Sequence, residues 1–214
     1  MNKTILSLIV ATAAGMPAML AAGAQTSTNL IRINTNQVSK TNVVGNTNGT
    51  SRTPTVVTNS NPSGNLTRAD AHFLAVAAID SLHEIAIGFL AQTNSTNADV
   101  QAFGAKLVAD HTDAYNAAVD LANSNNVTLP AKETRVQLAQ DERLARLSGR
   151  QFDVAFDNIM ISSHQQEISL FESEAIRAHD AGVRAYARSQ LPVLMDHFVT
   201  ALDIREELRA SSSP

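Results

Sequence analysis

Four titratable residues could act together in this chain, because each lies near the middle of one long stretch with helical periodicity. They are Glu84, His111, His164 and His197. Mid-helix residues of a helical bundle share one layer, so we expect these four side chains to converge in its interior. A polar group buried there without a hydrogen bond costs about 1–3 kcal/mol, so each side chain needs a partner.

Two arrangements of these side chains satisfy that need. One carboxylate and three imidazoles can bind a divalent transition metal, with neighbouring carboxylates orienting the rings. The expected orienting residues are Asp110, Glu167 and Asp196. In the other arrangement, the four side chains satisfy one another as a buried polar network without a metal. No role is expected for the three histidines that lie off the apolar stripes or at helix ends, His72, His83 and His179.

The helical pattern is clearest around His111. From Val100 to Leu121, alternating steps of four and three residues meet apolar or small side chains at every position except His111. Such a stripe is typical of a helix packed into a bundle, and we expect this helix over about 97–125.

Three further long helices are expected, at about 67–92, at about 150–178, and from Gly182 to about Arg209. Pro192 should kink the last of them, because proline removes one backbone hydrogen bond. A shorter amphipathic helix is expected at about 132–147, and its inward-facing residues should be Val136, Leu138, Leu144 and Leu147.

Four long helices predict an all-α fold, a four-helix bundle over about 67–210. The roughly 25-residue connection between the second and third long helices is long enough to cross the bundle, as ferritin-like topologies require. The short extra helix lies within this crossover. On the third long helix, Asp153 and Asp157 form a pair that we interpret as a solvated or capping feature.

The chain before the bundle has two parts. Residues 1–24 are typical of a secretory signal peptide, with Lys3, an apolar run from Ile5, and a small-residue cleavage site that ends at Ala24. Residues 25–66 are rich in Asn and Thr and are predicted to be a disordered linker. We therefore expect export to the periplasm or cell envelope, or secretion, and no transmembrane segment after cleavage.

Composition excludes several classes of function. The 214 residues contain no cysteine, which excludes disulfides, thiolate metal sites and cysteine nucleophiles. Residues 1–67 carry four basic and no acidic side chains, so the net charge of −4 comes from an acidic bundle. An acidic domain does not favour nucleic-acid binding, which needs clustered Lys and Arg. No phosphate-binding glycine loop, nucleophile elbow or H-E-x-x-H motif occurs.

A series of residues in order resembles the exported bacterial family known as domain of unknown function 4142, a ferritin-like group. The series consists of Phe73 with Glu84, Asp110-His111, Leu129-Pro130, Gly149-x-x-Phe152-Asp153, His164 with Phe171, and Leu191-Pro192-x-Leu194-x-x-His197. The resemblance covers about 68–205 and implies a ferritin-like bundle in the cell envelope without an assigned activity.

Iron oxidation and storage do not carry over from the ferritin-like group. Its di-iron proteins use Glu-x-x-His on two helices, whereas the tetrads that end here at His111 and His197 begin with Val108 and Leu194. The hypothesis that the sequence favours is a non-enzymatic exported module that binds a metal or an envelope partner. A metal-dependent redox enzyme of the envelope and a structural or stress-related interaction domain are the alternatives.

Overall fold

The computed structural model of the chain describes residues 66–211, and these form five helices and no strand. The helices are α1 (Arg68–Asn94), α2 (Ala98–Ser124), α3 (Arg135–Leu144), α4 (Gly149–Arg177) and α5 (Ala181–Ala210). The prediction of an all-α bundle is confirmed. The expected signal peptide and nearly all of the expected linker lie outside the described residues.

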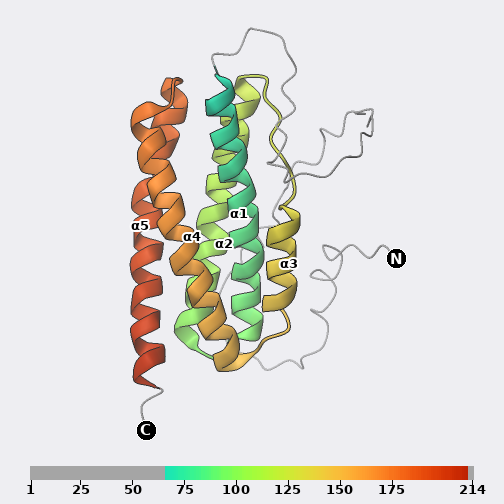
Figure 1. The fold of residues 1–214 in the computed structure, drawn as a ribbon, viewed down its shortest axis with the longest axis vertical. Helices are drawn as coiled ribbons and strands as arrows, with labels where there is room; N and C mark the ends of the chain where they lie inside the picture. Colours follow the sequence, from blue (N-terminus) through green and yellow to red (C-terminus); the bar gives the residue numbers. More distant parts are fainter. Residues whose placement is uncertain (1–65, 212–214) are drawn as a thin grey trace, which may run out of the picture. The chain divides into compact units, whose positions relative to one another are not determined.

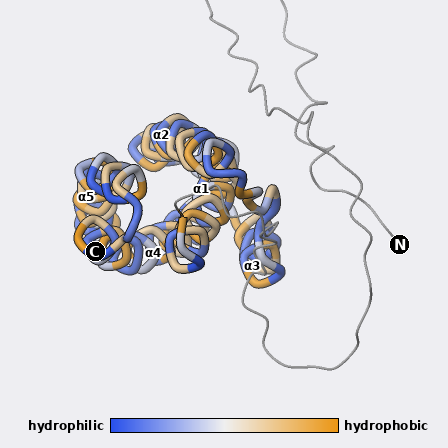
Figure 2. Tube along the Cα trace, turned by 90° about the horizontal axis from the view of Figure 1, so that it is seen from above, coloured by the Kyte–Doolittle hydropathy of each residue, from blue (hydrophilic) through white to orange (hydrophobic). Residues whose placement is uncertain are grey.

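The four long helices surround a common interior, which is visible when the bundle is viewed end-on (Figure 2). α1 packs on α2, α4 packs on α5, and contacts of α2 with α5 and of α1 with α4 close the bundle. The connection that contains α3 runs back along the bundle, so α2 and α4 point in the same direction (Figure 1). α3 lies outside the four-helix arrangement, against α1.

Side-chain caps fix where the helices begin. Thr67 and Asp70 form a capping box at the start of α1, and Asn97 caps the backbone N–H groups that open α2. Asp70 also accepts hydrogen bonds from the backbone N–H groups of His179 (2.8 Å) and Asp180 (3.3 Å), which joins α1 to the α4–α5 turn. Burial alone would raise the pKa of Asp70, but these hydrogen bonds together hold it below its ordinary value of 3.8.

The apolar interior consists of two separate cores, one towards each end of the bundle. The first core contains Phe73 and Phe171, whose ring centroids are 4.9 Å apart. The second core contains Phe103 and Phe156, at 5.9 Å. Each core takes residues from all four long helices, and the buried polar side chains at mid-helix belong to neither.

Two glycines allow α1 and α2 to approach each other closely. A Cβ atom on Gly104 would lie 2.6 Å from the backbone oxygen of Gly88 and 2.6 Å from the Cβ atom of Ala91. Neither distance is compatible with ordinary packing, so the contact depends on glycine at position 104.

The expected orientation of the short helix is wrong in part. Leu144 is buried as predicted, but Val136 is 73% exposed and Leu138 is 42% exposed. The reason is that α3 packs on the outside of α1, where only a narrow strip of its surface is covered. In α5, the helix continues through Pro192.

α1 is long and apolar enough, by length and composition alone, to cross a membrane; among the described helices, it alone meets that test. In the bundle, 61% of its most apolar window is buried. A central core helix satisfies the same test, so the composition of α1 follows from its place in the interior.

Candidate metal centre

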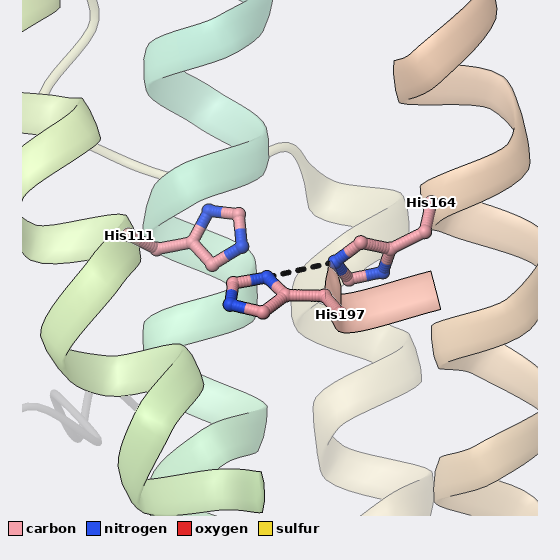
Figure 3. Close-up of side chains that lie close together, drawn as sticks. All are labelled: His111, His164 and His197. Atoms are coloured by element: carbon pink, nitrogen blue, oxygen red, sulfur yellow. Dashed lines mark hydrogen bonds between the residues drawn. The ribbon is translucent and has the colours of Figure 1, made fainter. Parts of the chain in front are cut away.

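The structure brings together the four mid-helix residues, one from each long helix. Glu84 comes from α1, His111 from α2, His164 from α4 and His197 from α5, and each is at most 3% exposed. The three rings point toward one another (Figure 3), and one ligand atom from each lies within 4.8 Å of the others. The layer forms because each residue is near the middle of a helix of 27–30 residues.

Two of the rings lie in a line of polar contacts between Met160 and Asp110. The Nδ1 atom of His164 is 2.9 Å from the carbonyl oxygen of Met160. The Nε2 atom of His164 is 3.2 Å from Nδ1 of His197, and Nε2 of His197 is 2.8 Å from Oδ2 of Asp110.

This line of contacts has one hydrogen too few for every contact to be a hydrogen bond. Its three contacts need three hydrogens, but two neutral imidazoles carry only two. The carbonyl of Met160 and the carboxylate of Asp110 can only accept, so the hydrogens belong on Nδ1 of His164 and Nε2 of His197. The lone pairs of the other two ring nitrogens then face each other across 3.2 Å.

The electrostatics of the site do not favour a third proton on these rings. Burial lowers the pKa of His197 to about 4, reinforced by the nearby His111, although the hydrogen bond to Asp110 acts in the opposite direction. Burial also lowers the pKa of His164, against the opposing effect of Glu84. Both rings are therefore neutral at pH 7, with lone pairs that are free to bind a cation.

His111 lacks aligned hydrogen-bond partners within the described part of the chain. Its Nε2 atom lies 2.5 Å from Oε2 of Glu84, but the contact does not have the geometry of a hydrogen bond, and both atoms and Nδ1 of His111 are buried. Nδ1 of His111 has no hydrogen-bond partner among the described residues, and a buried nitrogen of this kind costs about 1–3 kcal/mol.

Glu84 is a buried carboxylate. Burial would raise its pKa, but the facing rings of His164 and His111 and a hydrogen bond from Ser163 (2.7 Å to Oε1) hold the pKa well below the ordinary value. Burial raises the pKa of Glu167 well above its ordinary value, and the charge of Glu84 adds to this effect. Burial and the charge of Glu84 also raise the pKa of Asp80 to about 6. Crowded carboxyl groups of this kind attract a cation.

The three expected orienting residues occupy different positions. Asp110 contacts His197 directly and accepts a hydrogen bond from Lys106 at 2.6 Å. Glu167 is buried beside Glu84, and with Glu84 and His111 it forms a second group of ligand atoms within 4.8 Å of one another. Asp196 has a side chain that is 61% exposed, and it contacts Lys106 rather than a ring, at 3.3 Å.

One cluster was missed by sequence reasoning, which gave His83 no role. His83 is 5% exposed, and its Nδ1 atom lies 2.9 Å from Oδ1 of Asp141 and 3.3 Å from Oε1 of Glu133. Burial opposes a charge on His83, but the two carboxylates raise its pKa to about 9. Periodicity places His83 away from the bundle interior, so the sequence offers only one signal for this cluster. That signal is the pair of acidic residues Glu133 and Asp141, which lie eight residues apart in the crossover.

The interpretation of Asp153 and Asp157 as solvated is wrong. Both are buried, at 3% and 2% exposure, and Oδ2 of Asp157 lies 2.5 Å from Nε of Arg205 on α5. Burial raises the pKa of Asp157, while Arg205 lowers it.

Two cavities lie beside the central layer. A small one of about 10 Å³ is lined by His111, Glu167 and Tyr186 and has room for about one water molecule. A groove of about 340 Å³ between α1, α3 and α4 is lined by Asp80, His83 and Glu167 among others.

Comparison with known proteins supports the resemblance seen in the motifs. The model of the family Domain of unknown function (DUF4142) matches residues 55–204. A search of curated proteins and a search of solved structures each gave no match. The matched segment covers more than half of the chain and includes all four mid-helix residues, so the chain belongs to the DUF4142 family.

Proposed function

We propose that this protein is an exported helical-bundle module that binds a divalent transition metal through Glu84, His111, His164 and His197. Export is supported by Lys3, the apolar run that follows it and the small residues up to Ala24. A ferritin-like topology is supported by the long crossover, which leaves α2 and α4 parallel.

The observation that carries the proposal is the missing hydrogen between His164 and His197. A metal ion relieves this defect, because it accepts both lone pairs where neither ring can donate. Two imidazole nitrogens bound to one tetrahedral ion lie roughly 3.3–3.4 Å apart, since each Zn–N bond is about 2.0–2.1 Å. The observed separation of these nitrogens is 3.2 Å.

The other groups of the layer support the same conclusion. His111 brings a buried nitrogen without an aligned hydrogen bond, and Glu84 brings a buried negative charge that offsets part of the charge of a cation. Asp110 fixes the tautomer and orientation of His197, as carboxylates do for histidines that bind metals. Imidazole-rich sites favour zinc, copper, iron or nickel over magnesium or calcium.

The test is a metal titration of the full chain after treatment with a chelator. An ion at 100 times its Kd stabilises the folded state by about 2.7 kcal/mol. Such a gain raises Tm by roughly 5–11 °C in a chain of this size, at about 2–4 °C per kcal/mol. Zinc should therefore raise Tm, and His197→Ala and His111→Ala should each abolish the part of the rise that comes from this site.

His72→Ala is the matched control, because His72 is exposed on α1 and should leave the titration unchanged. If zinc, manganese, copper and iron(II) all leave the wild-type Tm unchanged at neutral pH, the metal proposal is wrong. The layer would then be a polar network, and the same substitutions would only destabilise the bundle.

A further inference from the structure

We propose that His83, Glu133 and Asp141 form a second divalent-cation site, separate from the central layer, in which a bound ion fixes α3 against α1. The three residues come from different segments of the chain. His83 lies on α1, Glu133 precedes α3, and Asp141 lies within α3. Their ligand atoms lie within 4.8 Å of one another.

The two carboxylates of this cluster differ in their hydrogen bonding to His83. Both carboxylates approach the same atom, Nδ1 of His83, which carries a single hydrogen and can donate well to only one of them. The hydrogen bond goes to Glu133, whereas Oδ1 of Asp141 is buried without a hydrogen bond at 2.9 Å from the ring. A cation that displaces this hydrogen, which leaves to solvent as a proton, would contact all three ligands and balance the charge of both carboxylates.

The burial of the cluster suits a bound ion. The side chains are 7% exposed for His83, 11% for Glu133 and 15% for Asp141, so water can compensate the charges only in part. The adjoining groove between α1, α3 and α4 gives an ion a path from solvent. One imidazole with two carboxylates suits ions that accept both nitrogen and oxygen ligands, such as manganese, iron(II), cobalt or zinc.

The position of the site gives the ion a structural role. α3 has ten residues and a single buried apolar side chain, Leu144, so apolar packing contributes little to holding it. Gln137 adds one hydrogen bond to Asp80, at 2.8 Å. A ligand set that spans α1, the preceding segment and α3 therefore adds a link between these segments that the apolar packing does not provide.

The two sites lie on different faces of the same turn of α1. His83 and Glu84 are consecutive, and neighbouring residues on a helix point about 100° apart, so His83 faces α3 while Glu84 faces the bundle interior. The two ligand sets share no residue, so a ligand of one site can be replaced without removing a ligand of the other.

The experiment counts manganese and zinc ions bound by the full chain, using titration with elemental analysis after dialysis. The wild type should bind two ions. Asp141→Asn and Glu133→Gln should each remove one, and His164→Ala should remove the other. Glu142→Gln is the matched control, because Glu142 neighbours Asp141 on α3 and is exposed.

Hydrogen exchange of residues 135–144 supplies a second readout. Added manganese should slow the exchange of these amides by tenfold or more in the wild type and in Glu142→Gln, but not in Asp141→Asn. One ion that is lost in His164→Ala and kept in Asp141→Asn would overturn this proposal and leave the central site standing. One ion that is lost in Asp141→Asn and kept in His164→Ala would support the second site and overturn the proposed central site. Protection of α3 that does not respond to metal would show that the cluster is a simple ion pair between His83 and its carboxylates.

Discussion

Replacing Gly104 by alanine should push α1 and α2 apart. The added Cβ atom would lie 2.6 Å from Ala91 Cβ and from the backbone oxygen of Gly88. Non-bonded carbon atoms pack at about 3.5–4.0 Å, so the helices must separate locally by about 1 Å. The backbone oxygen cannot rotate away as a side chain would, which places the cost near the upper end of the roughly 1–3 kcal/mol typical of overpacking.

A gain in helix propensity offsets part of this cost. Alanine is favoured over glycine in a helix interior by about 1 kcal/mol, so the net loss of unfolding free energy for Gly104→Ala should be roughly 1–2 kcal/mol. Urea unfolding of the variant and the wild type measures the difference directly. Ala105→Gly, at the exposed neighbouring position, measures the propensity term alone.

The substitution should also weaken the central layer. Gly88 lies one turn after Glu84, and Gly104 lies two turns before His111. A local separation of α1 from α2 would therefore lengthen the contact between Glu84 and His111. We expect zinc to stabilise Gly104→Ala less than it stabilises the wild type. A variant that is more stable than the wild type by the full propensity gain would refute the close approach of the two helices.

Three further tests, each by urea unfolding, address the packing and the buried charges. Leu107→Ala should cost about 2–5 kcal/mol, because it opens a cavity in the second core, whereas Val136→Ala should cost under about 0.5 kcal/mol on the exposed side of α3; equal effects would contradict the core assignment. Asp70→Asn should cost about 1–3 kcal/mol at pH 7. Because the folded pKa of Asp70 is lowered, its stabilisation is present above pH 3.8 and is lost as the pH falls through the folded value, so the difference between variant and wild type should shrink only below that pH. Arg205→Met should cost about 3 kcal/mol by leaving Asp157 buried without its partner, and a second change, Asp157→Asn, should restore part of the loss.

The sequence was sufficient to predict the helices and the central layer. Apolar periodicity with capping residues sets helix bounds to within a few residues, as at Thr67 and Asn97. Helices of nearly equal length then bring their midpoints into one layer, which is why the spacing alone places Glu84 and His111 together, as the structure shows.

The orientation of α3 and the partners of His83 and Asp157 depend on tertiary packing that periodicity does not encode. Val136 is apolar and has helical spacing, yet it faces solvent, because the path of the crossover decides which side of α3 is covered. His83 was missed for the same reason, since both of its partners belong to that crossover. Asp157 looks solvated in sequence because its partner Arg205 is 48 residues away on another helix.

The two apolar cores give the bundle two potential units of unfolding. Both cores use all four long helices, and the layer of Glu84 and the three histidines lies between them along every helix. Cooperativity between the two ends of the bundle therefore depends on the continuous helix backbones and on that one layer. An ion that binds all four helices at this level would join the ends into a single cooperative unit. Without it, native-state hydrogen exchange should divide the amides of the two ends into separate stability classes, with the boundary at the histidine layer.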